Sequence, residues 1–514
     1  PRCAKMPRTD TVLAPCVTSS TGVVFGSRTA AVELPGDLLT PFGVFCLLDQ
    51  QQPPGSDAFL FEGALGRYSY VGVSGSVKAP RLTFNAEPRS DVHPLEALRA
   101  QLEQIRSEKS ADLPPFCGGY VGYLGWAASG WSEKIPQRLG PDPLFPEADL
   151  LHVTELVSFD HRQGRAWAVA TGTDDPARRA EALARRVLAV FGDGRRSSVR
   201  WPDALRRPAA QSLAAGLFGG KRPVRGLPEP RPLGGGERAF KAAVRKALDY
   251  IYAGDIFQVV LSQRFELPDC NGFSLYRTLR AASPAPYHFY LRLGGRELFG
   301  ASPELLVEVD QGQMVVRPIA GTRRRGESAK EDAELERDLK ADPKERAEHT
   351  MLVDLGRNDV GRVSRIGTVR VPRLMEIERF SHVMHLVSEV NGKLHRGLGS
   401  VDAFASAFPA GTLSGAPKIR ALQIIDELET VQRGPYGGAV GWFSGAGDVQ
   451  LAIAIRTLFR SGERLFAQAG AGIVADSTPE REWEEVLAKV RASVGAAYGA
   501  VLGRDAALAE AATR

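Results

Sequence analysis

The stretch DPKERAEHTMLVDLGRNDVGR, residues 342–362, has the features of a helix with acidic residues near its start. Asp342 can cap such a helix, Pro343 suits its first position, and Glu345 lies three residues after the cap. Glu345 and Glu348 are also three residues apart, so their carboxylates project from one face. A capping glutamate beside a solvated one is the plainer interpretation, and this pair alone favours it over a binding site.

A second segment, DSTPEREWEEVLAKV at 476–490, repeats the pattern. Thr478 and Pro479 can open another helix, and Glu482 and Glu485 have the same spacing of three residues. Two helix starts that each offer an acidic pair would hold one hard cation, with waters and substrate oxygens completing its coordination. The two segments together therefore predict a Mg²⁺ site made of four glutamates: Glu345, Glu348, Glu482 and Glu485.

The composition is that of an ordinary globular protein. The 514 residues are 43% hydrophobic and 24% charged, with a net charge of +5, and suit two to four domains or one unusually large α/β unit. No apolar run approaches the roughly 18 residues of a membrane span, and the first residues lack the apolar core of a signal peptide. No basic helix face or aromatic RNA-binding signature appears, so we expect neither a membrane nor a nucleic-acid partner.

The cysteines indicate a reducing compartment. They are odd in number and widely scattered, which gives neither a disulfide framework nor a CxxC metal site. We therefore expect a cytoplasmic protein. The five are Cys3, Cys16, Cys46, Cys117 and Cys270.

The chain divides into segments of different character. Residues 1–20 are expected to form a flexible tail, and 504–514 a C-terminal tail. Between them, a β-rich region at 21–191 is separated from a denser region at 236–503 by a Gly-, Pro- and Arg-rich linker at 192–235.

In the first region, short β-rich runs alternate with turns. The apolar run PFGVFCLLDQ at 41–50 is predicted to be one of the strands. Helices are expected over 94–107 and 175–190.

In the second region, strands arrive in hairpins with helices between them. Helices are expected over 237–254, 414–429 and 479–500, and three strands over 436–474. This order predicts an α/β fold of the α+β type, with large antiparallel sheets and helices packed outside.

Two turns have residues that suit anion binding. PIAGTRRRG at 318–326 ends a strand in small residues whose backbone N–H groups would bind a carboxylate, although an ordinary turn with solvated arginines explains it equally well. FPAGTLSGAPKIR at 408–420 leads into a helix whose N-terminus favours an anion. AGAGIV at 469–474 is a third turn of small residues. None is a GxGxxG or Walker motif.

Three single residues are candidates for chemistry, and each also has a plain structural interpretation. Arg456 lies among apolar residues and is costly to bury without an anion, yet it also suits an exposed strand position. His385 alternates with hydrophobic residues and is either a core histidine or a proton carrier. Glu304 follows Ser-Pro and is either a turn carboxylate or a general acid. No GxSxG, HExxH or glutaminase-like nucleophilic cysteine occurs.

Several motifs together resemble the chorismate-utilising enzymes, with anthranilate synthase component I as the most similar branch. They occur in the family's order over roughly 237–500, and the region from about 35 to 170 is similar to its N-terminal part, less closely. The family's fold is a large α/β unit with two antiparallel sheets stacked in the centre and helices outside. The motifs include AGDIFQVVLSQRF (253–265), PIAGTRRRG (318–326), SHVMHLVS (381–388), FPAGTLSGAPKIRA (408–421) and AGAGIVADSTPEREWEE (469–485).

The resemblance assigns roles to individual residues. The four glutamates would surround Mg²⁺, which would hold the ring carboxylate of chorismate. Glu304 would protonate the departing C4 hydroxyl while ammonia attacks C2, His385 would assist the later loss of pyruvate, and Thr412 would lie nearby. The substrate would be bound by Tyr436, Arg456 and the backbone of Gly470, Ala471 and Gly472, with Gly321 and Thr322 opposite.

Two positions distinguish branches of the family. Gln258 stands where the water-adding relatives carry a lysine base, and Ala320 stands where many aminodeoxychorismate synthases carry a nucleophilic lysine. Neither residue can take those roles, so both positions point to direct amination at C2. The resemblance to anthranilate synthase component I, rather than these two positions, implies anthranilate as product. Release of 2-amino-2-deoxyisochorismate without loss of pyruvate remains open. Ammonia would come from a separate glutamine amidotransferase subunit.

The family's tryptophan feedback site is altered. Its LLES motif is here Leu60 to Gly63, so the serine is replaced by Gly63, and its PYM triplet is Pro286, Tyr287 and His288. Loss of the serine hydroxyl removes a hydrogen bond worth ~1 kcal/mol. We therefore expect weak or absent inhibition by tryptophan.

Overall fold

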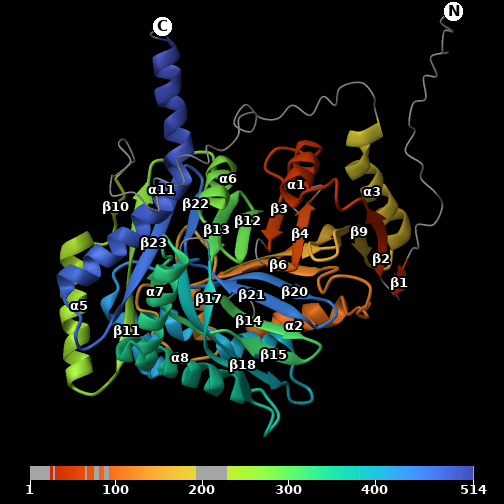
Figure 1. Cartoon of the computed structure of the whole chain (residues 1–514). Coiled ribbons are helices and arrows are strands. Elements are labelled where there is room, and N and C mark those ends of the chain that lie inside the picture. Colours follow the sequence, from red (N-terminus) through yellow and green to blue (C-terminus); the bar gives the residue numbers. More distant parts are fainter. Residues whose placement is uncertain are drawn as a thin grey trace, which may run out of the picture.

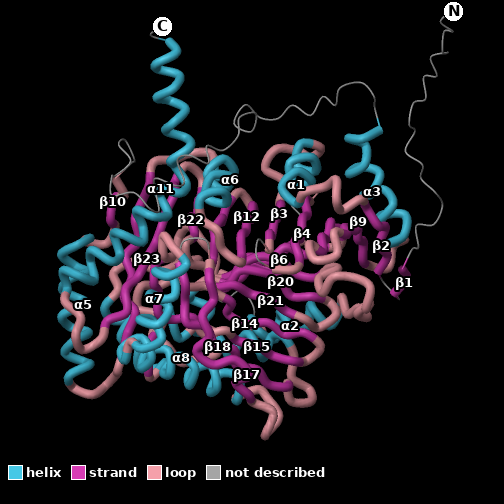
Figure 2. The backbone as a smooth tube through the Cα atoms, in the orientation of Figure 1, coloured by secondary structure: helices cyan, strands magenta, loops and turns pink. Residues whose placement is uncertain are grey.

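The computed structural model of the protein describes residues 24–26, 29–63, 66–74, 80–85, 92–192, 229–380 and 383–512. Two large sheets form its centre and helices lie around them (Figures 1 and 2). All strand pairs within both sheets are antiparallel, which confirms the predicted fold class. The expected tail at 1–20 and residues 193–228 of the expected linker lie outside the described residues.

The first sheet contains strands from both the N-terminal and the C-terminal regions of the chain. At its middle, β3 pairs with β12, with Leu60 opposite Tyr290. A short strand, β19 (Gly415–Ala416), pairs with β11 outside the main order. The order is β1 (Val24–Gly26), β2 (Thr29–Leu34), β9 (Arg165–Thr171), β8 (Glu155–Asp160), β4 (Tyr68–Val73), β3 (Ala58–Glu62), β12 (Tyr287–Leu293), β13 (Arg296–Ser302), β22 (Thr457–Ser461), β23 (Arg464–Ile473), β11 (Gln258–Leu267) and β10 (Arg231–Pro232).

The second sheet also combines strands from early and late parts of the chain. Strand β6 pairs with β20, with Val121 opposite Trp442. Strand β17 (Arg370–Arg379) pairs with β18 outside the main order. Both sheets therefore contain strands from each side of the 193–228 segment. The order is β16 (Ile319–Arg324), β18 (Val383–Lys393), β15 (Gln313–Val316), β14 (Leu305–Asp310), β21 (Val449–Ile453), β20 (Ala439–Ser444), β6 (Gly119–Leu124), β7 (Ala148–Val153) and β5 (Arg81–Phe84).

The helices cover the sheets from outside (Figure 1). Helix α8 packs on β16 and β18, and α11 packs on β23 and on α6. No helix among the described residues is long and apolar enough to cross a membrane. The α-helices are α1 (Pro41–Gln50), α2 (Pro94–Gln104), α3 (Pro176–Gly192), α5 (Gly236–Tyr252), α6 (Gly272–Ala282), α7 (Ala329–Ala341), α8 (Pro343–Gly361), α9 (Ser400–Ala407), α10 (Lys418–Leu428) and α11 (Pro479–Ala512).

The predicted strand at 41–50 is wrong, because these residues form α1. The hydroxyl of Thr40 accepts a hydrogen bond from the backbone N–H of Gly43 at 3.1 Å, and Pro41 occupies the first turn. A short apolar run fits a buried strand or a buried helix equally well. The Thr-Pro start was the signal that distinguishes them.

Three other boundaries differ from the prediction. Helix α10 begins at Lys418 rather than 414, because residues 415–416 pair with β11 instead. Helix α11 extends to Ala512, beyond the expected end at 500 and into the predicted C-terminal tail at 504–514. The stretch 436–474 contains four strands rather than three, because the chain changes sheet between β21 and β22.

At two places the chain crosses from one sheet to the other, and each crossing carries a candidate functional residue. Glu304 lies where the chain passes from β13 in the first sheet to β14 in the second, and Arg456 lies where it returns from β21 to β22. The backbone N–H of Ile453 donates to the carbonyl of Glu304 at 3.0 Å, and that of Ala301 donates to the carbonyl of Arg456 at 3.2 Å. The two crossings are therefore side by side.

Candidate active site

A cavity of about 780 Å³ lies between the sheets and helices α8 and α11. Most residues that the sequence selected line it. Gly321, Ala471, His385 and Glu345 do not line it but lie next to residues that do. The lining set includes Gln258, Glu304, Thr322, Glu348, Thr412, Tyr436, Arg456, Gly470, Gly472, Glu482 and Glu485.

Glu304 has the environment of a general acid. Its side chain is 8% exposed, and the hydroxyl of Thr412 donates to its Oε1 at 3.0 Å. Burial raises the pKa of this carboxyl to about 8, against the opposing effects of Thr412 and the charge of Arg456. Glu304 therefore carries a proton at neutral pH and can deliver it inside the cavity.

Arg456 supplies positive charge to the cavity. It stands in the turn between β21 and β22 with a φ of +49°, not within a strand as the alternation suggested. Its side chain is exposed, and that exposure faces the cavity that it lines. The surrounding walls desolvate the guanidinium and lower its pKa, while Glu304 opposes this shift. An arginine remains charged under these conditions and suits a carboxylate partner.

His385 is held as a neutral base. It is 7% exposed, and its Nδ1 lies 3.2 Å from the carbonyl oxygen of Gly321 and 3.0 Å from the hydroxyl of Thr322. A carbonyl only accepts, so we assign the ring proton to Nδ1, which leaves the lone pair on Nε2. Burial lowers the pKa of His385, which keeps the ring neutral.

The stretch PIAGTRRRG is a strand with a bulge, not the turn that we predicted. Strand β16 pairs with β18 and its register shifts between Ala320 and Thr322. Gly321 at the bulge has a φ of +70°, a conformation that favours glycine, and a Cβ there would lie 3.1 Å from Glu345 Oε2. Arg323 donates to Asp338, Asp342 and Glu345 at 2.7 to 3.0 Å. The side chain of Arg323 therefore connects β16 to α7 and α8, and its hydrogen bonds are used within the protein.

Strand β23 presents small residues to the cavity. A Cβ on Gly470 would lie 3.0 Å from the hydroxyl of Tyr436, and one on Gly472 would lie 2.7 Å from Nε2 of Gln258. Ala471 is fully buried and points to the other face of the strand. The glycines thus make space for two polar side chains, and burial raises the pKa of Tyr436, which keeps its hydroxyl neutral.

The helix that carries the first acidic pair, α8, begins as predicted. Helix α8 starts at Pro343, and the carboxylate of Asp342 accepts hydrogen bonds from the backbone N–H groups of Lys344 and Glu345. Arg323 binds Glu345 at 3.0 Å. Glu348 is half-buried, and its pKa is raised first by burial and then by the negative charge of Glu345.

The acidic pair on α11 lies across the cavity. Burial raises the pKa of Glu482, the hydrogen bond with Ser477 lowers it, and the charge of Glu485 raises it again. Glu485 also raises the pKa of Glu348 on the other helix, so the two pairs repel one another. Glu485 itself is bound by Lys489 at 2.7 Å.

These carboxylates fit a divalent cation. A cation placed among them would offset both the desolvation and the repulsion that raise the pKa values of Glu348 and Glu482, and carboxylate oxygens are the ligands that Mg²⁺ prefers. In the described part of the chain, no three His, Cys, Asp or Glu side chains already form a group able to hold a metal ion. The glutamates instead stand as two pairs on separate helices.

None of the altered feedback residues Gly63, Pro286, Tyr287 and His288 lines this cavity, but Ser283, whose carbonyl His288 contacts, does. A Cβ on Gly63 would lie 2.5 Å from the carbonyl oxygen of Tyr68. His288 is 3% exposed and its Nε2 donates to the carbonyl of Ser283 at 2.8 Å. The backbone at Gly63 leaves no space for a serine.

The sequence did not single out Lys489 or Gln468, which also line the cavity. Lys489 donates to the carbonyl of Gly470 at 2.8 Å and so connects α11 to β23. Its position four residues after Glu485, on the same helix face, was a signal that sequence reasoning could have used. Gln468 donates to Ser262 on the neighbouring strand at 2.9 Å, a contact with no local sequence signal.

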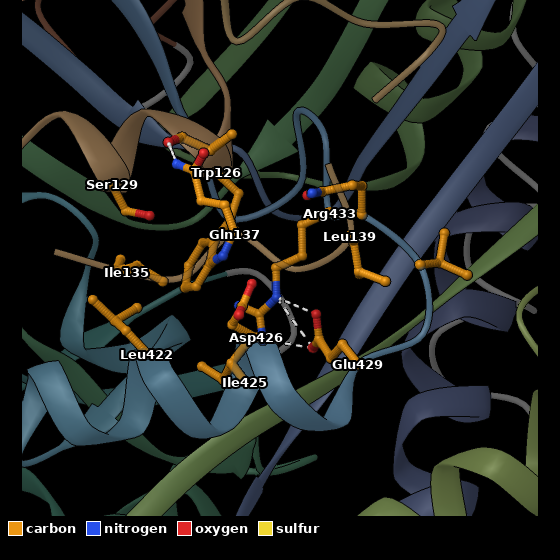
Figure 3. Close-up of a pocket in the computed structure, with 13 residues that line it drawn as sticks. Trp126, Ser129, Ile135, Gln137, Leu139, Leu422, Ile425, Asp426, Glu429 and Arg433 are labelled. Carbon is orange, nitrogen blue, oxygen red and sulfur yellow. Dashed lines mark hydrogen bonds and ion pairs between the residues drawn. The ribbon is translucent and has the colours of Figure 1, made fainter. Parts of the chain in front are cut away.

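A second, small cavity of about 30 Å³ lies behind this site, between Trp126 and α10 (Figure 3). Arg433 is 1% exposed, forms an ion pair with Glu429 at 2.7 Å, and lies 3.9 Å from the ring centroid of Trp126. It also donates to the carbonyl of Leu413 at 2.8 Å. This side chain therefore supports the turn that carries Thr412.

Comparison with known proteins agrees with this geometry. The family model described as "chorismate binding enzyme" matches residues 56–495. The chain belongs to this family. Anthranilate synthase component 1 of Streptomyces coelicolor is 44% identical over 90% of this chain and 88% of its own length, and that of Thermus thermophilus is 43% identical over 91% and 97%.

Solved structures give the same picture for this chorismate binding enzyme. The crystal structure of anthranilate synthase component I from Streptococcus pneumoniae is 32% identical, with a TM-score of 0.65 over 96% of this chain and all of the other. The menaquinone-specific isochorismate synthase of Escherichia coli is 19% identical, with a TM-score of 0.63 over 91% and 94%. The second likeness shows a shared fold alone.

Proposed function

We propose that this chain aminates chorismate at C2 with ammonia and then eliminates pyruvate, giving anthranilate, as the large subunit of an anthranilate synthase in tryptophan biosynthesis. The observation that carries the proposal is Glu304, a protonated acid in a cavity where Gln258 stands in place of a base that would activate water. Relatives with 40–44% identity carry the name anthranilate synthase component 1.

Chorismate is a dianion, and the cavity has charges of the sign needed to hold it. Arg456 would bind one carboxylate, with the neutral hydroxyl of Tyr436 nearby. Gly470 and Gly472 leave space for the substrate against β23, and Thr322 closes the opposite side. These groups orient the ring between Glu304 and His385.

Glu345, Glu348, Glu482 and Glu485 would hold Mg²⁺. When bound, Mg²⁺ would neutralise the ring carboxylate of chorismate and so allow it to lie beside four glutamates. For Glu345 this requires exchange of its contact with Arg323, and for Glu485 exchange of its contact with Lys489.

In the first step, the nitrogen of ammonia forms a bond to C2 of the ring. Both ring double bonds shift by one position, from C1=C2 and C5=C6 to C1=C6 and C4=C5, and the C4–O bond breaks, while Glu304 gives its proton to the departing hydroxyl, which leaves as water. The excess proton on the new amine passes to solvent. Thr412 then hydrogen-bonds the carboxylate that Glu304 has become.

In the second step, the C2 proton is removed and the C3–O bond to the enolpyruvyl group breaks. The ring becomes aromatic and the enol leaves as pyruvate after protonation. The neutral His385, with its lone pair on Nε2, is the group that takes the proton. Its presence favours the full reaction over release of the amino-dihydro intermediate.

The name component 1 of the relatives implies a second component. We propose that it is a glutamine amidotransferase that supplies ammonia and that free ammonium at high concentration replaces it. The location proposed from the scattered cysteines is cytoplasmic, and Cys46 and Cys117 are free thiols.

A product assay tests the proposal. The purified chain is given chorismate, Mg²⁺ and excess ammonium at mildly alkaline pH, and products are identified by mass. Anthranilate and pyruvate in equal amounts are expected. Aminodeoxyisochorismate without pyruvate would overturn the second step, and absence of any chorismate turnover would overturn the proposal.

A further inference from the structure

Helices α8 and α10 are joined by a buried ion pair that takes no direct part in the proposed chemistry. Lys418, the first residue of α10, donates from Nζ to both carboxylate oxygens of Asp359 on α8, at 2.9 and 2.8 Å. The side chains are 9% and 8% exposed. Neither residue lines the large cavity. A buried ion pair is weak evidence for stability, so its presence calls for another explanation.

Lys418 ends a short segment, 411–418, that touches three parts of the site. Thr412 donates to the carboxyl of Glu304 at 3.0 Å. Residues 415–416 pair with the start of β11, where Ala416 is opposite Gln258. Lys418 then binds α8, the helix that carries Glu345 and Glu348.

The segment packs closely against α8. A Cβ on Gly411 would lie 2.8 Å from Cδ1 of Leu355 on that helix. Glu304, Thr412 and Asp359 also line one small cavity of about 40 Å³. The aspartate of the ion pair therefore borders the same small cavity as the bond between Thr412 and Glu304.

We propose that Lys418 is a positioning residue, whose ion pair with Asp359 holds the 411–418 segment against α8 so that Thr412 stays bonded to Glu304. Arg433 holds the same segment from its other side through the carbonyl of Leu413. The inference rests on the proposed function, since it takes Glu304 as the acid of the amination step.

The test is the pH dependence of kcat with ammonium as nitrogen source, expressed per concentration of free NH3. Thr412 and Arg456 are the groups that act on Glu304, and both lower its pKa. Loss of the Thr412 bond raises that pKa, so the acid keeps its proton to higher pH. In both Thr412→Val and Lys418→Met, the alkaline limb of the plot of kcat against pH is expected to move up by about one pH unit. The value of kcat is expected to fall about tenfold.

Three further variants separate positioning from stability. The double variant Thr412→Val/Lys418→Met is expected to show the shift of either single variant and no more, because both act through one bond. Lys418→Arg keeps the charge and is expected to restore most of the wild-type profile. Lys109→Met removes another lysine–aspartate interaction away from the cavity, with Asp448 at 2.6 Å and with Asp310, and is expected to leave the alkaline limb unchanged.

If Lys418→Met is too unstable to assay, Asp359→Asn/Lys418→Met removes both charges and avoids an unpaired buried ion. The proposal is overturned if either variant folds and keeps the wild-type alkaline limb, or if the shifts of Thr412→Val and Lys418→Met add. Absence of turnover in the wild type would instead overturn the proposed function, so the two failures are distinguishable.

Discussion

The large cavity and the region around Gly63 differ in how completely their buried carboxyl groups are paired with basic side chains. In the cavity, burial raises the pKa values of the Glu304 and Glu348 carboxyls, and the basic groups near them offset this only in part. Near Gly63, the neighbouring Glu62 is 6% exposed but accepts hydrogen bonds from Tyr276 at 2.7 Å and from Arg280 at 2.6 Å.

The difference separates a cavity whose buried carboxyls are incompletely paired from a region whose buried carboxylate is paired within the chain. Charges left without partners cost stability, and such a cost is retained where a bound ion or substrate repays it. Around Gly63 the same cost has been removed by pairing and by close backbone packing. The number of charged residues is therefore a poorer guide to function than how completely each charge is paired.

The largest effect is expected at Glu348 and Glu485, which line the cavity from α8 and α11. Glu348→Ala and Glu485→Ala should each lower kcat/KM with ammonium by at least about 10³-fold while the protein stays folded, because the proposed cation site would lose a ligand. Steady-state kinetics and circular dichroism measure this. Glu484→Ala, which removes an exposed neighbour, is the matched control and should keep near-wild-type activity. Near-wild-type rates in either cavity variant would remove the metal argument.

Glu304→Gln should lower kcat by about 10²- to 10⁴-fold, the usual range for loss of a general acid. The wild-type rate should fall as pH rises through about 8, because Glu304 then loses its proton. The residual activity of the variant should lack this limb. A residual rate in Glu304→Gln that still falls near pH 8 would assign the titration to another group.

A smaller effect is expected on stability. The pKa of Glu304 is raised by folding, so its contribution to stability is fully present below the pKa of the unfolded chain and is lost as pH rises toward 8. The Tm of Glu304→Gln relative to the wild type should therefore increase between pH 5 and 8, by about 2 °C. Differential scanning fluorimetry at several pH values measures this. A constant difference across that range would contradict the assigned pKa.

The smallest effect is expected from tryptophan. The closed backbone at Gly63 should limit inhibition of the wild type to less than about twofold at 0.1 mM, a concentration that would saturate a micromolar site. A tryptophan titration of the ammonium-dependent rate measures this, with glycine as control. Inhibition at micromolar concentrations would show that the region around Gly63 is still a ligand site.

Local signals in the sequence were enough to find the helices that carry the glutamates. Asp342 with Pro343, and Thr478 with Pro479, predicted the starts of α8 and α11, and both starts are confirmed. The Thr-Pro start at residue 40 has the same form, but its apolar run was interpreted as a strand. Caps decide such cases better than hydrophobicity does.

The arrangement around Glu304 could not be predicted. Its environment depends on two crossings between sheets, and the crossing residues Glu304 and Arg456 are far apart in sequence. The bond from Thr412 and the ion pair of Lys418 with Asp359 also join distant positions. The family resemblance named Glu304 and Arg456, but the physical reason for a raised pKa is visible only in three dimensions.

The central claim is that the glutamates and the arginine of the cavity bind a cation and a dianion together. Calorimetric titration of chorismate into the protein, with and without Mg²⁺, tests it most directly. We predict that each ligand tightens binding of the other by about tenfold or more, as reciprocal coupling requires, and that Glu348→Ala abolishes the coupling. Equal chorismate affinity with and without Mg²⁺ would contradict the account.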